Sequence, residues 1–215
     1  MEIVNIIKEP AWEIFLLNNQ PSKEFEQYYK KRLRENKNSY WQTLAEAETA
    51  YLIHSKFKIP VLGFNKKTVG EKDVDLIAQL GDEEIYIEVT TSRYKNNKNT
   101  DKQQDAKLIR TLKHAGEKFL ANDINLLVVY DEQLDSTFYN GFFMHDDVPA
   151  TYFNCAFFED DGGSKIDIRK ISGLLLFGQR KQLDYSREHK IWKNENAYKS
   201  LSIDIELVLN TGLSW

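Results

Sequence analysis

The chain has 215 residues, of which 41% are hydrophobic and 29% are charged, so its composition is that of a globular domain and excludes a disordered or fibrous chain. No run of about 18 apolar residues occurs, and we therefore expect no membrane-spanning helix. The net charge of −4 argues against a protein that attracts polyanions through its overall charge. The first residues lack the pattern of a signal peptide, and the single Cys155 cannot form an internal disulfide, so we expect an intracellular protein.

Helices are predicted before the most regular part of the sequence. Residues 1–20 form a mixed segment, and residues 22–36 have the pattern of a helix that Ser22 caps. The sequence Ser39-Tyr40-Trp41-Gln42 matches a capping box and predicts a second helix that runs to about residue 57. Pro60 closes this helix, and we expect a basic loop over residues 65–72.

The most informative stretch is a predicted hairpin over residues 73–93. Two alternating runs, 74–80 and 84–90, flank the dipeptide Gly81-Asp82, which is typical of a two-residue type II′ loop. In this register Asp75 lies directly opposite Glu88, with Cβ atoms about 4.5–5.5 Å apart. The other face of the hairpin is apolar and suits a core, because it pairs Val74 with Val89, Leu76 with Ile87 and Ala78 with Ile85.

The segments that follow predict an α/β fold. A helix is expected from about 101 to 121, and the apolar run 124–130 is typical of a buried strand. The strand–helix–strand spacing favours a right-handed crossover that places 124–130 parallel to 85–90. Together with the helix before the hairpin, this gives an α-β-β-α-β core. Strands are also expected at 171–177 and 201–209.

The two opposed carboxylates predict a metal site. Carboxylates held this close repel each other unless a proton or a cation lies between them. Mg²⁺ is commonly bound by one or two carboxylates together with waters and phosphate oxygens. Asp75 and Glu88 are therefore candidate metal ligands, and the alternative is a pair of solvated acids on an exposed hairpin. Ile77 and Tyr86 share their face and favour partial burial.

This region resembles the PD-(D/E)XK nuclease superfamily, and within it most closely the archaeal Holliday-junction resolvases and their bacterial relatives. The resemblance covers about residues 40–130 and depends on Asp75-Leu76-Ile77-Ala78 and Ile87-Glu88-Val89-Thr90-Thr91. It implies a restriction-endonuclease-like fold, with a mixed central sheet flanked by helices, N-terminal helices and a C-terminal β extension. It also implies Mg²⁺- or Mn²⁺-dependent hydrolysis of DNA phosphodiester bonds, with junctions or other branched DNA as candidate substrates.

The resemblance also implies further site residues. In the resembling proteins a Glu on the helix before the hairpin completes the metal shell, which here gives Glu46 or Glu48. We favour Glu46, because it shares a helical stripe with the small residues Thr49 and Ala50. The main-chain carbonyl of Val89 is implied as another metal ligand.

The chain departs from the superfamily pattern at Thr90, where its members carry a lysine that positions the attacking water. Three explanations stay open: the role has moved to another element, Thr90 supports a slower reaction, or the chain only binds nucleic acid. If the role has moved, the helix after the hairpin offers Gln104 and Lys107, with Lys102 as a third candidate.

Two basic clusters flank the hairpin in the sequence. The first contains Lys30, Lys31, Arg32, Arg34 and Lys37, and the second contains Arg93, Lys95, Lys98, Lys102, Lys107, Arg110, Lys113 and Lys118. Basic side chains around an acidic metal pocket suit a phosphodiester substrate, and Lys30, Lys31, Arg32, Arg34, Arg93, Lys95, Lys98 and Lys102 are the candidate nucleic-acid contacts. The alternative is that these clusters are solvated helix faces.

We therefore expect a single nuclease-like domain, with an N-terminal helical addition at 1–38, a catalytic core at 39–130 and a sheet extension or dimerisation region at 131–215. A homodimer is expected by analogy, because a four-way junction offers two symmetric cuts. A catalytically inactive nucleic-acid-binding protein of the same fold is the main alternative, and a small-molecule or RNA-directed relative is the third.

Overall fold

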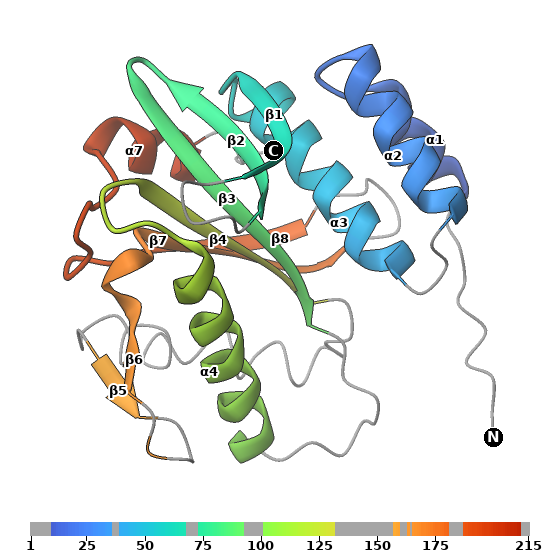
Figure 1. The fold of residues 1–215 in the computed structure, drawn as a ribbon. Coiled ribbons are helices and arrows are strands. Elements are labelled where there is room, and N and C mark those ends of the chain that lie inside the picture. Colours follow the sequence, from blue (N-terminus) through green and yellow to red (C-terminus); the bar gives the residue numbers. More distant parts are fainter. Residues whose placement is uncertain are drawn as a thin grey trace, which may run out of the picture.

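The computed structural model describes residues 10–35, 39–67, 73–92, 101–131, 157–159, 163, 165–180 and 187–211, which form a mixed α/β fold (Figure 1). The helices are α1 (Pro10–Asn18), α2 (Lys23–Glu35), α3 (Tyr40–Tyr51), α4 (Asp101–Lys118) and α7 (Ile203–Thr211). A π-helical turn, Leu52–Lys56, continues α3, and a 3₁₀ turn covers Ile168–Lys170. The strands are β1 (Val61–Lys67), β2 (Asp73–Leu80), β3 (Glu83–Ser92), β4 (Ile124–Asp131), β5 (Phe157–Glu159), β6 (Lys165–Asp167), β7 (Gly173–Arg180) and β8 (Arg187–Lys193).

Six strands form the central sheet in the order β1-β2-β3-β4-β7-β8, and β5 pairs with β6 separately. The inner pairs β3–β4 and β4–β7 are parallel, whereas β1–β2, β2–β3 and β7–β8 are antiparallel. The mixed sheet and the parallel crossover through α4 are therefore confirmed. No helix in the part of the chain that the structure describes is long and apolar enough to cross a membrane.

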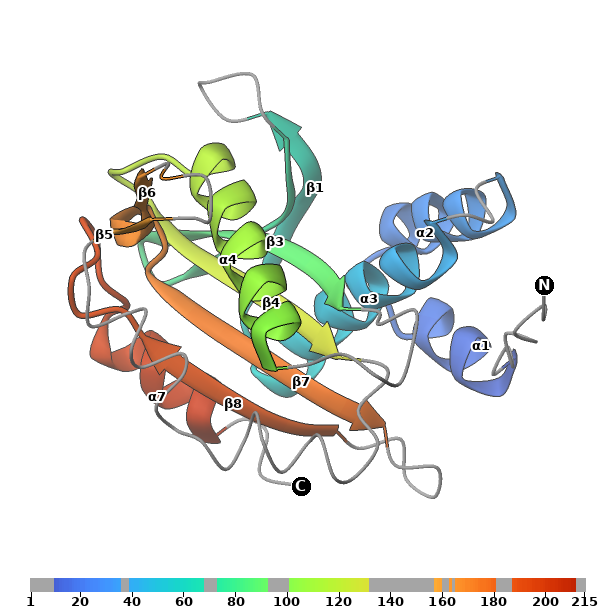
Figure 2. The ribbon, with the colours of Figure 1, turned by 90° about the horizontal axis from the view of Figure 1, so that it is seen from below.

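Helices cover both faces of the sheet. One buried cluster joins α1, α2, α3 and α7 to one face, and a second cluster joins α4 to the other face. Figure 2 shows α7 beside β8 and the three N-terminal helices gathered beyond β3. A buried hydrogen bond from Thr49 Oγ1 to Tyr130 Oη, 3.1 Å long, fixes α3 against β4. This packing brings the middle of α3 over the hairpin strand β3.

The hairpin forms in the predicted register. Leu76 pairs with Ile87 and Ala78 with Ile85, and all four side chains are buried. Gly81 has a φ of +59°, and Asp82 does not share this left-handed conformation, as a type II′ loop requires. The alternation of the sequence and the Gly81-Asp82 dipeptide were therefore sufficient to predict the hairpin.

The structure corrects one end of this hairpin. The β2–β3 ladder ends at Leu76 and Ile87, so the expected direct pairing of Asp75 with Glu88 is not part of it. The reason is that Val74 stays paired with Lys66 of β1, and β2 thus follows β1 away from β3. Val74 accordingly packs in the cluster beneath α4, and not beside Val89 as expected.

Two other expectations on secondary structure were wrong. Part of the expected basic loop at 65–72 belongs to β1, which adds a strand between α3 and the hairpin. Residues 201–209 were expected as a strand, but 203–211 form α7. The buried residues Leu201, Ile205 and Leu209 recur every four positions, whereas Ile203 and Leu207 are 78% and 59% exposed. The C-terminal extension of the sheet comes instead from β7, which overlaps the expected strand 171–177, and from β8.

Candidate active site

Three carboxylates from three elements lie near enough to influence one another's charge where β2 separates from β3. Glu46 comes from α3, Asp75 from β2 and Glu88 from β3, and we call these three residues the acidic cluster. Glu46 and Glu88 are only 2% and 6% exposed, and Asp75 is half-buried. Buried carboxylates are rare unless they are paired or bind a cation, so their surroundings decide what the cluster can do.

The main chain of one residue, Val89, connects the members of the cluster. The Val89 N–H donates to Asp75 Oδ2 at 2.8 Å, and the Val89 carbonyl accepts from Gln42 Nε2 at 2.7 Å. The same Gln42 amide lies 3.2 Å from Glu46 Oε1. The expected capping box is therefore wrong, since Gln42 reaches across to β3 and Ser39 makes no side-chain cap bond. The main-chain N–H and carbonyl of Val89 thus tie β2 and α3 to β3.

Two basic side chains neutralise part of the cluster. Arg32 of α2 forms an ion pair with Glu46 through Nη1 and Oε2, and its Nη2 lies 3.3 Å from Oε1. It also donates to Tyr28 Oη at 2.9 Å. Lys118, the last residue of α4, forms an ion pair with Glu88 Oε1. Arg32 therefore faces the buried acids. This arrangement favours a role in the acidic cluster over the predicted contact with nucleic acid.

The charges of the cluster influence one another. Burial raises the pKa of Glu46 to about 7 and that of Glu88 to about 8, and the charge of Asp75 is the second cause in both cases. Burial also raises the pKa of Asp75, although the Val89 N–H opposes this. Arg32 lowers the pKa of Glu46 and Lys118 lowers that of Glu88, but neither effect is large enough to offset burial. The cluster can therefore accept further positive charge.

Glu88 has an oxygen atom that can bind a ligand. Its Oε2 is buried and has no hydrogen-bond partner among the residues that the structure describes. A buried acceptor of this kind is unfavourable unless a water or an ion binds to it. Carboxylate and carbonyl oxygens are also the ligands that Mg²⁺ prefers. The donor set of the cluster thus suits a divalent cation.

The cluster is not arranged around a metal in this conformation. Within the described ranges, no three His, Cys, Asp or Glu side chains are grouped closely enough to hold an ion together. The Val89 carbonyl is occupied by Gln42, Glu46 by Arg32, and Glu88 Oε1 by Lys118. Direct binding of an ion by Glu46, or by Glu88 through Oε1, would therefore require Arg32 or Lys118 to move.

Several predicted site residues can be placed. Glu48 is as deeply buried as Glu46, but the contacts with Arg32 and Gln42 belong to Glu46. Thr90 lies two residues beyond Glu88 on β3, and both residues line a cavity beneath α4. Gln104, Lys107 and Lys102 lie in the first half of α4, and their side chains are outside the described part of the structure.

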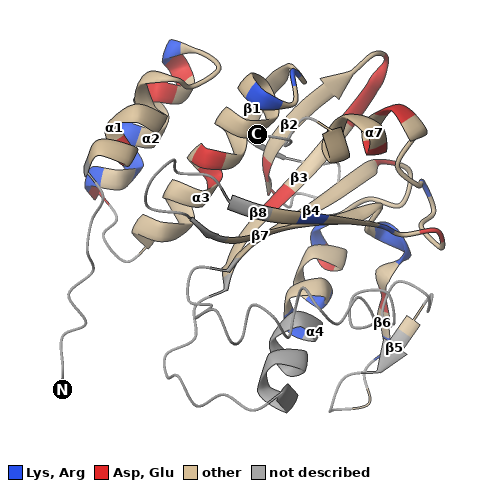
Figure 3. Cartoon of the chain, turned by 180° about the vertical axis from the view of Figure 1, so that it is seen from behind, with Lys and Arg blue, Asp and Glu red and all other residues tan. Residues whose placement is uncertain are grey.

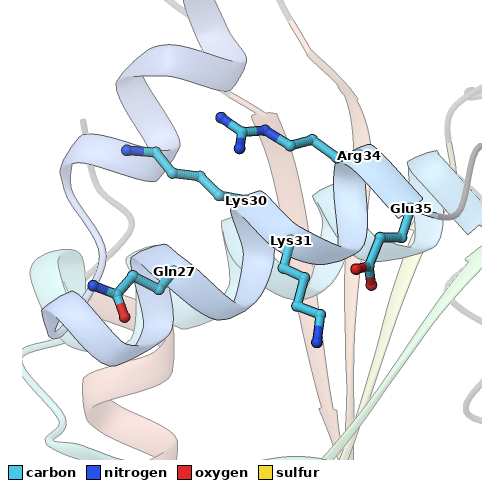
Figure 4. Close-up of a pocket in the computed structure, with 5 residues that line it drawn as sticks. All are labelled: Gln27, Lys30, Lys31, Arg34 and Glu35. Atoms are coloured by element: carbon cyan, nitrogen blue, oxygen red, sulfur yellow. The ribbon is translucent and has the colours of Figure 1, made fainter.

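Some residues of the two basic clusters can be placed and others cannot. Arg93, Lys95 and Lys98 lie outside the described residues. Figure 3 shows basic residues on α2 and α4 and acidic ones on α3 and β3. A shallow groove of about 330 Å³ runs along α2, and Figure 4 shows Lys30 and Arg34 extending from the same side of that helix. Lys30 also pairs with Glu26, and Lys31 lines the groove with Arg34.

The sequence interpretation missed Lys118 as a partner of the acidic cluster. It ends a helical stripe that begins with Thr111 and continues through His114 and Ala115, at spacings of three and four residues. Ala115 and Thr111 face the cavity beside Glu88, so this stripe was the signal that could have identified Lys118. The lysines that the sequence suggested for this role lie instead at the other end of α4.

No family model, no curated protein and no solved structure matches the chain. The fold and the site together define a mixed α/β protein with a buried acidic cluster at the open end of a hairpin.

Proposed function

We propose that the protein is a metal-dependent nuclease that hydrolyses DNA phosphodiester bonds at the acidic cluster. The observation that carries this proposal is the convergence of Glu46, Asp75 and Glu88 from α3, β2 and β3 where the two strands separate. The order α3-β1-β2-β3-α4-β4 also agrees with a restriction-endonuclease-like core to which β1 has been added. Because DNA is held inside cells, the proposal includes an intracellular location.

The cluster supplies suitable ligands for Mg²⁺ or Mn²⁺. Asp75, the free Oε2 of Glu88 and the Val89 carbonyl would hold the ion, with Glu46 bound directly or through a water. When bound, the ion would lower the pKa of a water molecule and offset negative charge on the phosphate. Gln42 would hold the Val89 carbonyl in place through its hydrogen bond to that oxygen, while it also contacts Glu46.

Lys118 is the residue that we assign to the role left open at Thr90. It has a long flexible stem, its side chain is 21% exposed, and it lies against Glu88. A divalent ion held by Glu88 would weaken this ion pair, and the ammonium group of Lys118 would then be able to turn to the phosphate and supply the positive charge that Thr90 lacks. Lys107 and Gln104 stay alternative candidates for this role, since their side chains lie outside the described residues.

A cleavage assay tests the proposal. Labelled four-way junction, flap, duplex and single-stranded DNA would be incubated with Mg²⁺ or Mn²⁺ and with wild type, Asp75→Asn or Asp204→Asn. Asp204 is exposed on α7 and serves as a control for the loss of one acid. We expect cutting by wild type and the control, and a loss of roughly a hundredfold or more in Asp75→Asn. Equal cutting by all three proteins would refute the proposal.

A nucleic-acid-binding protein without catalysis is the second candidate. It is favoured by the ion pairs of Glu46 and Glu88, which neutralise part of the cluster without a metal, and by the uncharged Thr90. In that case all three proteins would bind DNA with the same affinity and none would cut it with either ion. The substrate that binds best would then indicate the biological partner.

The expected homodimer is also part of this proposal. The exposed Ile203 and Leu207 of α7 lie in the region 131–215 that was expected to contain the dimer contact. Sedimentation of wild type and of Leu207→Glu would test it. A wild-type monomer at high concentration would contradict a dimeric junction-cutting enzyme.

A further inference from the structure

A second feature of the site is a cavity of about 200 Å³ between the sheet and α4. It is lined by Glu88 and Thr90 of β3, by Leu127 of β4, and by four residues of α4, namely Arg110, Thr111, His114 and Ala115. A water molecule takes up about 30 Å³ in the liquid, so the cavity has room for a group as large as a phosphate. It lies beside the acidic cluster, with which it shares Glu88.

The α4 wall of the cavity consists of hydrogen-bond donors. Arg110 and His114 are four residues apart, and Thr111 lies between them, so the three side chains share one side of the helix. Across the cavity, Thr90 adds a second hydroxyl group. A guanidinium, an imidazole and two hydroxyls together can bind several oxygens of one anion, and the planar guanidinium suits a phosphate in particular.

The cavity is also lined by a hydrogen-bond acceptor, the carboxylate of Glu88. Glu88 is only 6% exposed, and its buried Oε2 has no hydrogen-bond partner among the described residues. A carboxylate alone would repel an anion in the cavity. A divalent ion held by Glu88 would offset this repulsion. The wall of donors and the unpartnered acceptor therefore point to one ligand pair, an anion and a cation.

We propose that this cavity is a phosphate subsite, in which Arg110, His114 and the two threonine hydroxyls hold a phosphodiester group next to a divalent ion bound at Glu88. The inference rests on the proposed function for the identity of the polymer and the ion. It adds the residues that hold the phosphate, and it places the phosphate on the α4 side of β3. Because Lys118 also contacts Glu88 from α4, its ammonium group lies on the side where the phosphate would bind.

The test uses binding and needs no turnover. Dimethyl phosphate, a phosphodiester without bases, would be titrated into the full chain with and without Ca²⁺, and the ring proton resonances of His114 would be followed by NMR. His114→Gln identifies these resonances among the four histidines of the chain. We expect saturable shifts with Ca²⁺ present and an affinity about tenfold lower without it.

Two substitutions on the same helix separate the cavity from general charge. Arg110→Gln should weaken the binding of dimethyl phosphate about tenfold, because one charged hydrogen-bond donor is lost. Lys113→Gln removes the same charge from α4 outside the cavity lining and should change the affinity by less than about twofold. Arg110 is exposed, so its replacement should leave the fold intact.

Several results would overturn the inference. Absence of any shift at His114, or equal losses in Arg110→Gln and Lys113→Gln, would mean that the cavity holds only water. Binding of the dinucleotide thymidylyl-thymidine without binding of dimethyl phosphate would mean that the cavity recognises a base. If the wild type binds dimethyl phosphate but never cuts DNA, the phosphate subsite stands and the nuclease is refuted. If it cuts DNA but binds no phosphate in this cavity, the nuclease stands and the subsite is refuted.

Discussion

Replacement of Glu88 by Gln should make the stability of the protein less dependent on pH. Glu88 is buried beside Asp75, and its pKa in the folded chain is about 8, against 4.5 for an ordinary Glu. The folded state therefore holds a proton that the unfolded state has lost between these two pH values. Since the unfolded state binds fewer protons, the free energy of unfolding of the wild type should fall as the pH rises from 4.5 to about 8, and then level off.

The size of this effect follows from the pKa. Each pKa unit corresponds to about 1.4 kcal/mol, so the rise to about 8 makes ionised Glu88 less favourable in the folded chain by at most roughly 5 kcal/mol. Solvent reaches the cluster through the half-buried Asp75, and this reduces the effect. We therefore expect Glu88→Gln to gain about 1–3 kcal/mol relative to wild type between pH 5 and pH 8. Lys118 loses its partner in the variant, but its side chain can turn to solvent.

Urea unfolding at pH 5, 6, 7 and 8 measures this difference. Glu83→Gln, at the loop end of the same strand, is the control and should follow the wild-type curve. The variant should retain only the shallower slope due to Glu46 and Asp75. Parallel curves for wild type and Glu88→Gln would refute the reasoning, because they would show that Glu88 ionises equally easily in both states.

Four further substitutions test the packing around the site, the helix α7 and the hairpin loop. Gln42→Ala should lower the free energy of unfolding by about 1–2 kcal/mol, because it removes the donor to the Val89 carbonyl; an unchanged urea midpoint would contradict the contact between α3 and β3. Ile205→Ala should lower it by about 2–4 kcal/mol and Ile203→Ala by less than about 0.5 kcal/mol, since only Ile205 is buried; equal effects would argue for a strand in place of α7. Gly81→Ala should lower it by about 1 kcal/mol, because the φ of +59° is strained for alanine, and thermal unfolding would show no change if the loop had another conformation.

The sequence was sufficient for elements that local signals define. The hairpin was predicted because its period of two and the Gly81-Asp82 dipeptide agree, and β4 because a short apolar run is typical of a buried strand. The helix α7 was mistaken for a strand because alternate positions from Leu201 to Leu209 are all apolar, and a spacing of four also satisfies a period of two. The strand β1 was missed because the ladder shifts register between Val61 and Gly63, which disturbs its alternation.

The candidate site could be predicted only in part for a physical reason. Asp75 and Glu88 lie next to the last pair of the hairpin ladder, Leu76 and Ile87, so the hairpin places both acids at the same end of the two strands. Arg32 and Lys118 reach the cluster from α2 and α4, and their contacts depend on how those helices pack against the sheet. The separation of β2 from β3 at Asp75 likewise depends on β1, a strand that the sequence did not reveal. Tertiary packing therefore determined which charges meet.

The bonds made by Val89 have a consequence for the substitutions that the site tolerates. Residue 89 joins the acidic cluster through its N–H and its carbonyl, while its side chain packs in the core on the α3 face of the sheet. Isoleucine or another β-branched residue at this position could therefore change the core without altering a single polar contact of the cluster. Proline alone would remove the N–H that Asp75 accepts, and a genetic screen of position 89 should reject it even where larger apolar residues survive.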